Sequence, residues 1–310
     1  MTRLQGLNMT KLTVGFIGLG AMGDPMARRV AQAGFDLVVM DADLDKAREI
    51  AAATSGRVAN TGKALAEASD VIVTMLPSSA VVRAVLEGET GVAAGLKPGT
   101  VLLEMSSGVP DETRRIAEEL ADKGIHLVDA PVSGGVSRAT TGELAIMAGG
   151  SDEGFALGEA VLAAMGSSII RTGPVGSAHA MKALNNLVSA GGFLIGIEAL
   201  LIGSRFGLDP ELMVDVLNVS TGMNNSTQKK FKQFVLSRSF NAGFGLDLMV
   251  KDLGIAMGVA EATGTTAPFA SLCRDMWRDA QQALGTGLDH TDVARFSELL
   301  AGSELHPGKK

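Results

Sequence analysis

The sequence contains few of the residues that build disulfides, metal sites or nucleic-acid interfaces. Its single cysteine, Cys273, excludes an internal disulfide and is compatible with a reducing compartment. The four histidines are scattered without the spacing of metal ligands, so we expect no metal site. The net charge of −7 comes without a basic run, which argues against nucleic acid as a partner.

The sequence also lacks a segment typical of membrane targeting. Residues 1–11 have no apolar core of a signal peptide, and we expect a cytoplasmic protein. The long stretch 177–205 is interrupted by Lys182 and Glu198, whereas a membrane span needs ~20 predominantly apolar residues. Because this stretch turns apolar almost all round beyond Asn186, we expect a helix buried on all sides and no membrane partner.

The order of the remaining patterns predicts two domains. Strand and helix patterns alternate through the first half of the 310 residues, and only helix patterns follow residue 205. Alternating patterns predict parallel βαβ units. We therefore predict an α/β fold: a Rossmann-type, doubly wound, mainly parallel sheet over 1–175, an interdomain helix over 176–205, and an all-helical domain over 206–310.

The expected elements can be placed along the chain. The predicted strands, which are short and apolar, cover 13–18, 36–40, 71–75, 101–104, 125–129 and 143–148. The predicted helices, which follow capping or periodic signals, cover 25–33, 44–53, 152–165, 177–205, 210–218, 231–236, 246–261, 275–284 and 293–301. Residues 221–227 are predicted to form a polar loop.

A glycine-rich turn follows the first predicted strand. It matches the dinucleotide-binding pattern G-x-G-x-x-G, and its residues are Gly18, Leu19, Gly20, Ala21, Met22 and Gly23. The second predicted strand ends in Asp41, where a carboxylate can accept hydrogen bonds from the adenosine ribose. Asp41 could instead only cap the helix that follows. Together the turn and the acid predict a nicotinamide cofactor.

Two further groups of residues are candidates for the substrate site. Ser133 and the backbone amides of Gly134 and Gly135 follow a strand and could bind a carboxylate, or could form a plain turn. His179, Lys182 and Asn186 recur at helical spacing and define one polar face. There Lys182 would suit proton transfer and Asn186 substrate positioning, although a lysine is more commonly a solvated surface residue.

Four motifs together resemble a known family. They occur in order as Gly-Leu-Gly-Ala-Met-Gly-Asp-Pro-Met at 18–26, Asp-Ala-Pro-Val-Ser-Gly-Gly at 129–135, Lys-Ala-Leu-Asn-Asn at 182–186 and Lys-Asp-Leu at 251–253. Over about residues 12 to 300 the chain resembles the β-hydroxyacid dehydrogenases of the 3-hydroxyisobutyrate dehydrogenase type. Members of that family reversibly oxidise a small 3-hydroxy acid to its semialdehyde with a nicotinamide cofactor, and they usually form dimers or tetramers.

The resemblance implies roles for individual residues. It makes Lys182 the general acid/base and Asn186 its orienting neighbour, and it leaves His179 outside the family pattern. It assigns Lys251 to both the cofactor and the substrate. The residues implied for the substrate carboxylate are Ser133, Gly134 and Gly135. The further residues implied for the cofactor are Ser107 near the nicotinamide and Leu76 and Pro77 near the adenosine half.

Some residues depart from the family pattern and affect what can be expected of the substrate. Ala178 replaces a glycine, and Met105 stands where a small or polar residue is common, so that the nicotinamide-side wall would be bulkier. The loop 223–227 is expected to cap the substrate pocket, but its sequence does not correspond to a known substrate specificity. The identity of the hydroxy acid stays open.

Three other functions remain as alternatives. NADP-dependent semialdehyde or glyoxylate reductases are close relatives, but Asp41 would repel a 2′-phosphate and favours NAD over NADP. Imine reductases generally replace the lysine at 182 by aspartate or tyrosine. A non-catalytic NAD(P)-binding sensor would lose the lysine that this chain keeps.

Overall fold

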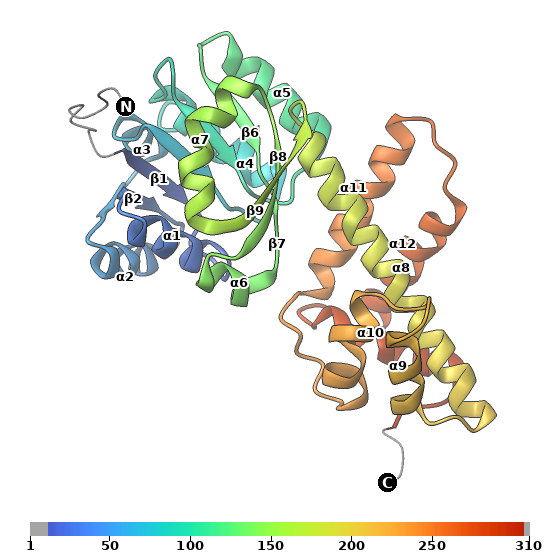
Figure 1. Cartoon of the computed structure of the whole chain (residues 1–310). Coiled ribbons are helices and arrows are strands. Elements are labelled where there is room, and N and C mark those ends of the chain that lie inside the picture. The colour runs from blue at the N-terminus through green and yellow to red at the C-terminus, as the bar shows by residue number, and fades with distance from the viewer. Residues whose placement is uncertain (1–11, 307–310) are drawn as a thin grey trace, which may run out of the picture. The chain divides into compact units, whose positions relative to one another are not determined.

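The structure of the chain is a computed structural model that describes residues 12–306 (Figure 1). The expectation about a signal peptide falls on residues 1–11, which lie outside the described residues. The chain divides into two compact units, of which the first ends at Lys182 and the second begins at Ala183. The division therefore lies inside the longest helix, whereas the sequence predicts domain limits at its two ends.

The first unit is built on one sheet. Among the described residues the sheet has nine strands in the order β3-β2-β1-β4-β5-β6-β8-β7, with β9 paired to β8. The parallel strands are β1 Thr13–Ile17, β2 Asp36–Met40, β3 Arg57–Val58, β4 Val71–Thr74, β5 Val101–Glu104 and β6 His126–Asp129. The others are β7 Val132–Ser133 and β8 Leu144–Gly149, which pair antiparallel, and β9 Gly166–Gly173, parallel to β8. The predicted mainly parallel, doubly wound sheet is confirmed.

Helices cover both faces of this sheet (Figure 1). One face packs on α1 Gly23–Gln32, α2 Leu44–Thr54 and α7 Asp152–Met165, and the other on α3 Gly62–Glu67, α4 Ser79–Leu86 and α5 Pro110–Ala121. Alternate residues of one strand therefore enter different cores: Leu103 lies in the first and Leu102 in the second. Burial on both faces explains why these strands are almost continuously apolar.

The second unit is helical. Its elements after the first turns of α8 Ser177–Phe206 are α9 Pro210–Asn218, α10 Asn225–Lys229, the π-helix η2 Phe231–Leu236, α11 Leu246–Ala262, α12 Pro268–Leu284, η3 His290–Asp292 and α13 Val293–Ala301. Their core is centred on Phe193 of α8, which meets Phe231 edge-on with ring centroids 5.4 Å apart and Trp277 at 6.0 Å. These aromatic contacts bury the apolar half of α8.

The expectation that α8 is buried on all sides beyond Asn186 is wrong for this chain. Val188, Ile195 and Ile202 are 76%, 54% and 70% exposed. The helix is long and apolar enough to cross a membrane by length and composition, with a mean hydropathy of 1.8, and half of that stretch is buried inside the chain. The core helix of a folded domain shows the same composition, and here the buried half packs around Phe193.

Several elements differ from the sequence prediction. The strand β9 is not predicted because its mostly exposed residues show no apolar alternation. Helix α12 begins at Pro268, seven residues earlier than predicted, with the proline in its first turn. A short helix, α10, begins within the predicted polar loop because Asn224 and Thr227 form a reciprocal capping box.

Candidate active site

The glycine turn between β1 and α1 has the geometry that a pyrophosphate needs. A Cβ on Gly18, where φ is +92°, would overlap the carbonyl oxygen of Met75, and one on Gly23 would overlap the carbonyl oxygen of Gly18. A Cβ on Gly20, by contrast, would meet no atom within 4 Å. The first and third glycines are therefore required by packing, and the second leaves open space beside the N-terminus of α1, where phosphate charge is favoured.

Asp41 holds the glycine turn against the end of β2. Its Oδ2 accepts a hydrogen bond of 2.6 Å from the Leu19 amide and its Oδ1 one of 2.9 Å from the Asp43 amide. The cap of α2 is Asp43, whose carboxylate accepts from the amides of Asp45 and Lys46. The alternative that Asp41 caps this helix is therefore wrong.

The ends of β4 and β5 are tied to each other and to the glycine turn. The Leu76 amide donates to Ser106 Oγ at 2.9 Å, and the Leu76 side chain lies against Gly18. Pro77 is exposed and Ser107 is half-buried beside this connection. Met105 is 1% exposed and packs in the core, so its bulk does not form the crevice wall that the sequence suggested.

The segment after β7 has the backbone of a tight turn. Gly134 and Gly135 have φ values of +139° and +68°, a region that favours glycine, and they lead into α6 Gly135–Thr141. Ser133 is half-buried and the two glycines are exposed. Turn geometry accounts for the glycines, and both residues lie at the surface.

A carboxylate from the sheet caps the start of α8. Asp129, the last residue of β6, accepts from the amides of Gly176 at 2.8 Å and His179 at 2.9 Å. Burial raises the pKa of Asp129, against the opposing effects of His179 and these amides. This contact fixes the first turn of the helix at the carboxyl end of the parallel strands, where ligands of such sheets bind.

His179 lies in a buried polar cluster. Its Nε2 is 3.0 Å from Glu104 Oε2, an ion pair rather than a well-aligned hydrogen bond, and its Nδ1 is 2.8 Å from Thr113 Oγ1. Burial opposes both charges, but the attraction between the partners outweighs it, so that the pKa of His179 is raised and that of Glu104 is lowered.

Lys182 and Asn186 are both buried. Lys182 is 8% exposed, so the alternative of a solvated surface lysine is wrong. In the second unit, Asn186 Nδ2 donates to Asp252 Oδ2 at 2.6 Å, and Lys251 Nζ is 3.6 Å from Asp252 Oδ1. The sequence prediction assigned no role to Asp252. Its position beside Lys251 in the middle of a largely apolar helix is the signal that could have found it.

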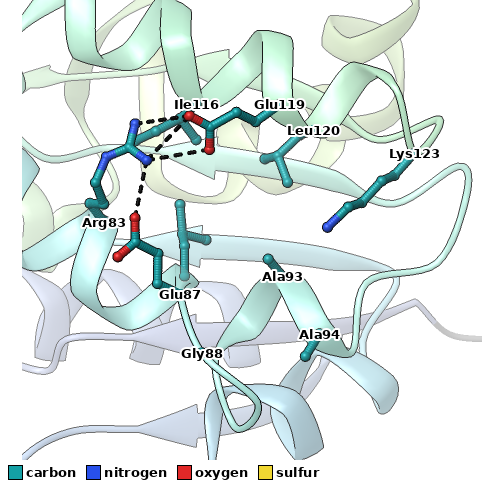
Figure 2. Close-up of a pocket in the computed structure, with 10 residues that line it drawn as sticks. Arg83, Glu87, Gly88, Ala93, Ala94, Ile116, Glu119, Leu120 and Lys123 are labelled. Carbon is teal, nitrogen blue, oxygen red and sulfur yellow. Dashed lines mark hydrogen bonds and ion pairs between the residues drawn. The ribbon is translucent and has the colours of Figure 1, made fainter.

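A separate cavity lies in the first unit, away from these residues. It has a volume of about 310 Å³ and lies between the C-terminal parts of α4 and α5 and the short helix η1 Val92–Ala94 (Figure 2). Arg83 contacts Glu87, Glu112 and Glu119 there, and these contacts raise the pKa of Arg83, the hydrogen bond to Glu112 most of all. The predicted site residues do not line it.

Comparison with known proteins identifies the family. Residues 13–173 match the family described as the NAD binding domain of 6-phosphogluconate dehydrogenase. Residues 176–297 match the family described as NAD-binding of NADP-dependent 3-hydroxyisobutyrate dehydrogenase. This chain belongs to the β-hydroxyacid dehydrogenase family. The resemblance found in the four motifs is confirmed, and the chain is an NAD(P)-dependent oxidoreductase acting on CH–OH donors.

Individual relatives resemble the chain over nearly its full length. It is 36% identical to 2-(hydroxymethyl)glutarate dehydrogenase of Eubacterium barkeri, covering 96% of this chain and 99% of that protein. It is 36% identical to the mitochondrial 3-hydroxyisobutyrate dehydrogenase of Mus musculus, covering 87% and 82%. The solved structure of Mycobacterium tuberculosis 3-hydroxyisobutyrate dehydrogenase with L-serine has a TM-score of 0.85 at 32% identity, covering 93% and 99%.

Proposed function

We propose that this β-hydroxyacid dehydrogenase reversibly oxidises the primary alcohol of a 2-substituted 3-hydroxypropanoate to its semialdehyde, with Lys182 as the general acid/base. The observation that carries the proposal is the burial of Lys182 one turn before Asn186, whose amide is held by Asp252. The three molecules named with the relatives, 3-hydroxyisobutyrate, 2-(hydroxymethyl)glutarate and L-serine, share the unit HO-CH2-CH(R)-COO⁻ and differ only in R.

The residues of the chain divide the chemistry among them. The open space at Gly20, the N-terminus of α1 and the Asp41 carboxylate fit a dinucleotide. A nicotinamide held there would supply the hydride acceptor for oxidation of the carbinol carbon. The neutral amine of Lys182 takes the hydroxyl proton during oxidation and returns it during reduction. Asn186, fixed by Asp252, orients the amine and the reacting oxygen.

Turnover of a panel of hydroxy acids tests this function. We expect activity with one or more of 3-hydroxyisobutyrate, L-serine and 2-(hydroxymethyl)glutarate, measured as absorbance of the reduced cofactor. Threonate and 4-hydroxybutyrate should be poorer substrates because in each the primary alcohol lies one carbon farther from the carboxylate, whereas glycerate keeps the common unit with R = OH and belongs to the proposed class. The proposal fails if 4-hydroxybutyrate or a simple primary alcohol without a carboxylate reacts faster than every 2-substituted 3-hydroxypropanoate.

Ser133, Gly134 and Gly135 are proposed to hold the substrate carboxylate. The amides of these two exposed glycines and the neighbouring hydroxyl are the donors that would bind it. Removing a hydrogen bond to a charged group costs ~1.5–3 kcal/mol, so Ser133→Ala should lower kcat/KM accordingly. The methyl ester of the best substrate should react poorly with the wild-type enzyme. An ester that reacts as well as the free acid would refute this role.

We further propose that NAD is preferred over NADP. The charge of Asp41 at the end of β2 would repel a 2′-phosphate, and Ala42 supplies no cation there. The ratio of kcat/KM for the two cofactors should favour NAD, and Asp41→Ser should reduce that ratio. Asp43→Ser is the matched control, because Asp43 caps α2. A wild-type preference for NADP contradicts the proposal.

A homodimer or homotetramer is proposed for the assembled enzyme. Val188, Ile195 and Ile202 recur every seven residues on α8 and are exposed in the single chain, and a large exposed apolar surface is typical of an interaction site. Light scattering should give the mass of two or four chains, and the double substitution Ile195→Glu with Ile202→Glu should reduce it. A monomeric wild-type enzyme at assay concentration would contradict this assembly.

A further inference from the structure

We infer that His179, paired with Glu104, is a positioning residue that fastens the helix carrying Lys182 to the cofactor-binding loops of the first unit. The inference rests on the proposed function, in which Lys182 moves the proton. It concerns residues that the family pattern does not include, and all of its contacts lie within the first unit.

The imidazole of His179 fixes both the rotation and the position of the first turns of α8. His179 and Lys182 are three residues apart, so their side chains lie on one face of the helix. The ring is fully buried and touches two other elements, β5 through Glu104 and α5 through Thr113. A helix held at two points of a ring and at the Asp129 cap cannot turn about its axis without breaking these contacts.

The groups that face the two ring nitrogens of His179 are those expected around an imidazolium. The Thr113 hydroxyl donates to the Val109 carbonyl at 3.0 Å, so toward His179 Nδ1 its oxygen accepts. Glu104 faces Nε2 with a carboxylate, which also only accepts. This arrangement fits a ring with hydrogen on both nitrogens, in agreement with the raised pKa of His179.

Further charged groups pack near this ion pair. Asp129 from β6 approaches the backbone of His179, and its negative charge favours the imidazolium. Arg114 of α5 packs on Gly176 and is itself paired with Asp111. A buried ion pair of this kind is stable only when its remaining hydrogen bonds are made, so the geometry that satisfies it is narrow.

The cluster continues from Glu104 to the glycine turn. Glu104 Oε1 accepts from the Ser106 amide at 2.9 Å, and Ser106 Oγ accepts from the Leu76 amide at 2.9 Å. Leu76 in turn lies against Gly18. A continuous set of contacts therefore runs from the helix of Lys182 through β5 and β4 to the loop proposed to bind the cofactor.

Gly108 shows how tightly the ring is enclosed. A Cβ at this position would lie 2.7 Å from His179 Cε1, 2.8 Å from Nδ1 and 3.1 Å from Glu104 Oε2. Gly108→Ala must therefore displace the imidazole or the loop, and it does so without changing any charge. It offers a second way to disturb the cluster, independent of removing the histidine.

Positioning and mere stabilisation predict different kinetics. If the cluster only stabilises the first unit, His179→Gln lowers the thermal midpoint and leaves kcat per folded molecule unchanged. If it positions Lys182, kcat falls while KM and the cofactor Kd do not change. A displacement of the reacting group by about 1 Å can cost ~10²-fold in rate, so we expect a ~10- to 100-fold loss of kcat.

The experiment compares His179→Gln, Glu104→Gln, the double variant and Gly108→Ala in steady-state turnover, cofactor binding by fluorescence, and thermal unfolding. We expect His179→Gln to lose kcat with unchanged KM and cofactor Kd, and we expect Glu104→Gln and Gly108→Ala to lose kcat as well. The variant that combines His179→Gln with Glu104→Gln should lose no more kcat than the worse of the two single variants, because both substitutions remove the same ion pair. Thr113→Val removes only the hydroxyl beside His179 Nδ1 and keeps the ion pair with Glu104. Its loss of kcat should therefore be smaller than that of His179→Gln.

His290→Gln is the matched control, because His290 is a buried histidine of the second unit, 3% exposed, with its Nδ1 bonded to the Phe244 carbonyl. It should lower the thermal midpoint and leave kcat unchanged. The inference is overturned if His179→Gln and Gly108→Ala keep wild-type kcat, or if His290→Gln loses as much. Near-normal kcat in Lys182→Ala would instead refute the proposed function, so the two failures are distinguishable.

Discussion

The two ends of helix α8 differ in the side chains that they bury: polar and charged ones near the start, and apolar ones further along. Near its start, His179, Lys182 and Asn186 are buried with polar or charged partners. Further along, Phe193 and Ile197 are buried among apolar side chains. Burying a polar group costs free energy unless its hydrogen bonds are replaced, whereas burying an apolar one stabilises the fold. We therefore expect substitutions at the first end to change mainly activity, and substitutions at the second end to change mainly stability.

Replacing Lys182 should have the largest effect of all these changes, and it should lower kcat without lowering cofactor affinity. A positioned acid/base contributes ~10²–10⁴-fold, so Lys182→Ala should lose that much kcat. Cofactor affinity should remain, because the glycine turn and Asp41 are untouched. Turnover and cofactor titration measure the two quantities separately.

Lys182→Arg sharpens the same test. A guanidinium keeps the positive charge but does not release its proton in this pH range, so this variant should also be poor. An active Lys182→Arg enzyme would show that charge, and not proton transfer, is what the first end of α8 supplies.

Phe193→Ala should show the opposite pattern. Removing a fully buried phenylalanine costs ~3–5 kcal/mol of unfolding free energy, here through lost contacts with Phe231 and Trp277. Urea unfolding should give this loss, while kcat per folded molecule stays near the wild-type value. A large fall in kcat for the folded fraction would contradict the division between the two ends.

Asn186 lies between the two ends, and its loss should affect both quantities. Asn186→Ala leaves the buried Asp252 without its 2.6 Å partner, and a hydrogen bond to a charged group contributes ~1.5–3 kcal/mol. We expect lower kcat and a lower thermal midpoint together. Asn185→Ala is the neighbouring control and should change both much less, since Asn185 makes a single 3.2 Å bond to Asn186.

The pH dependence of stability should differ in sign between the ends, which is the smallest expected effect. The pKa of His179 is raised from 6.5, so its contribution is complete below 6.5 and is lost as the pH rises through the folded value. Near Phe193, burial lowers the pKa of Lys230 from 10.5 to about 8, so the cost of burying its charge disappears between pH 8 and 10.5.

Urea unfolding at a series of pH values measures these contributions as differences. The advantage of wild type over His179→Gln should shrink as the pH rises above 6.5. The stability of wild type relative to Lys230→Met should increase from about pH 8 to 10.5. If the difference in unfolding free energy between wild type and His179→Gln does not change with pH, the ion pair between His179 and Glu104 does not stabilise the first end of α8.

The parts of the protein that were predicted correctly rest on local signals. The strand-turn-helix unit around Gly18 and Gly23, the alternation of strands and helices, and the start of α9 after Asp209 are each set within a few neighbouring residues. The four motifs were sufficient for the family because each is a short run. The roles of Lys182, Ser133 and Lys251 stay predictions.

The order of the elements, the glycine turn and the polar face at the start of α8 follow from local sequence, because backbone periodicity and glycine geometry act over a few residues. Which distant groups meet depends on the packing of the whole chain. Asp129 caps a helix 50 residues away, and Asn186 pairs with Asp252 across 66 residues. Glu104 meets His179 because the ends of β5 and β6 adjoin the first turn of α8, and a buried charge requires a partner that only this packing supplies.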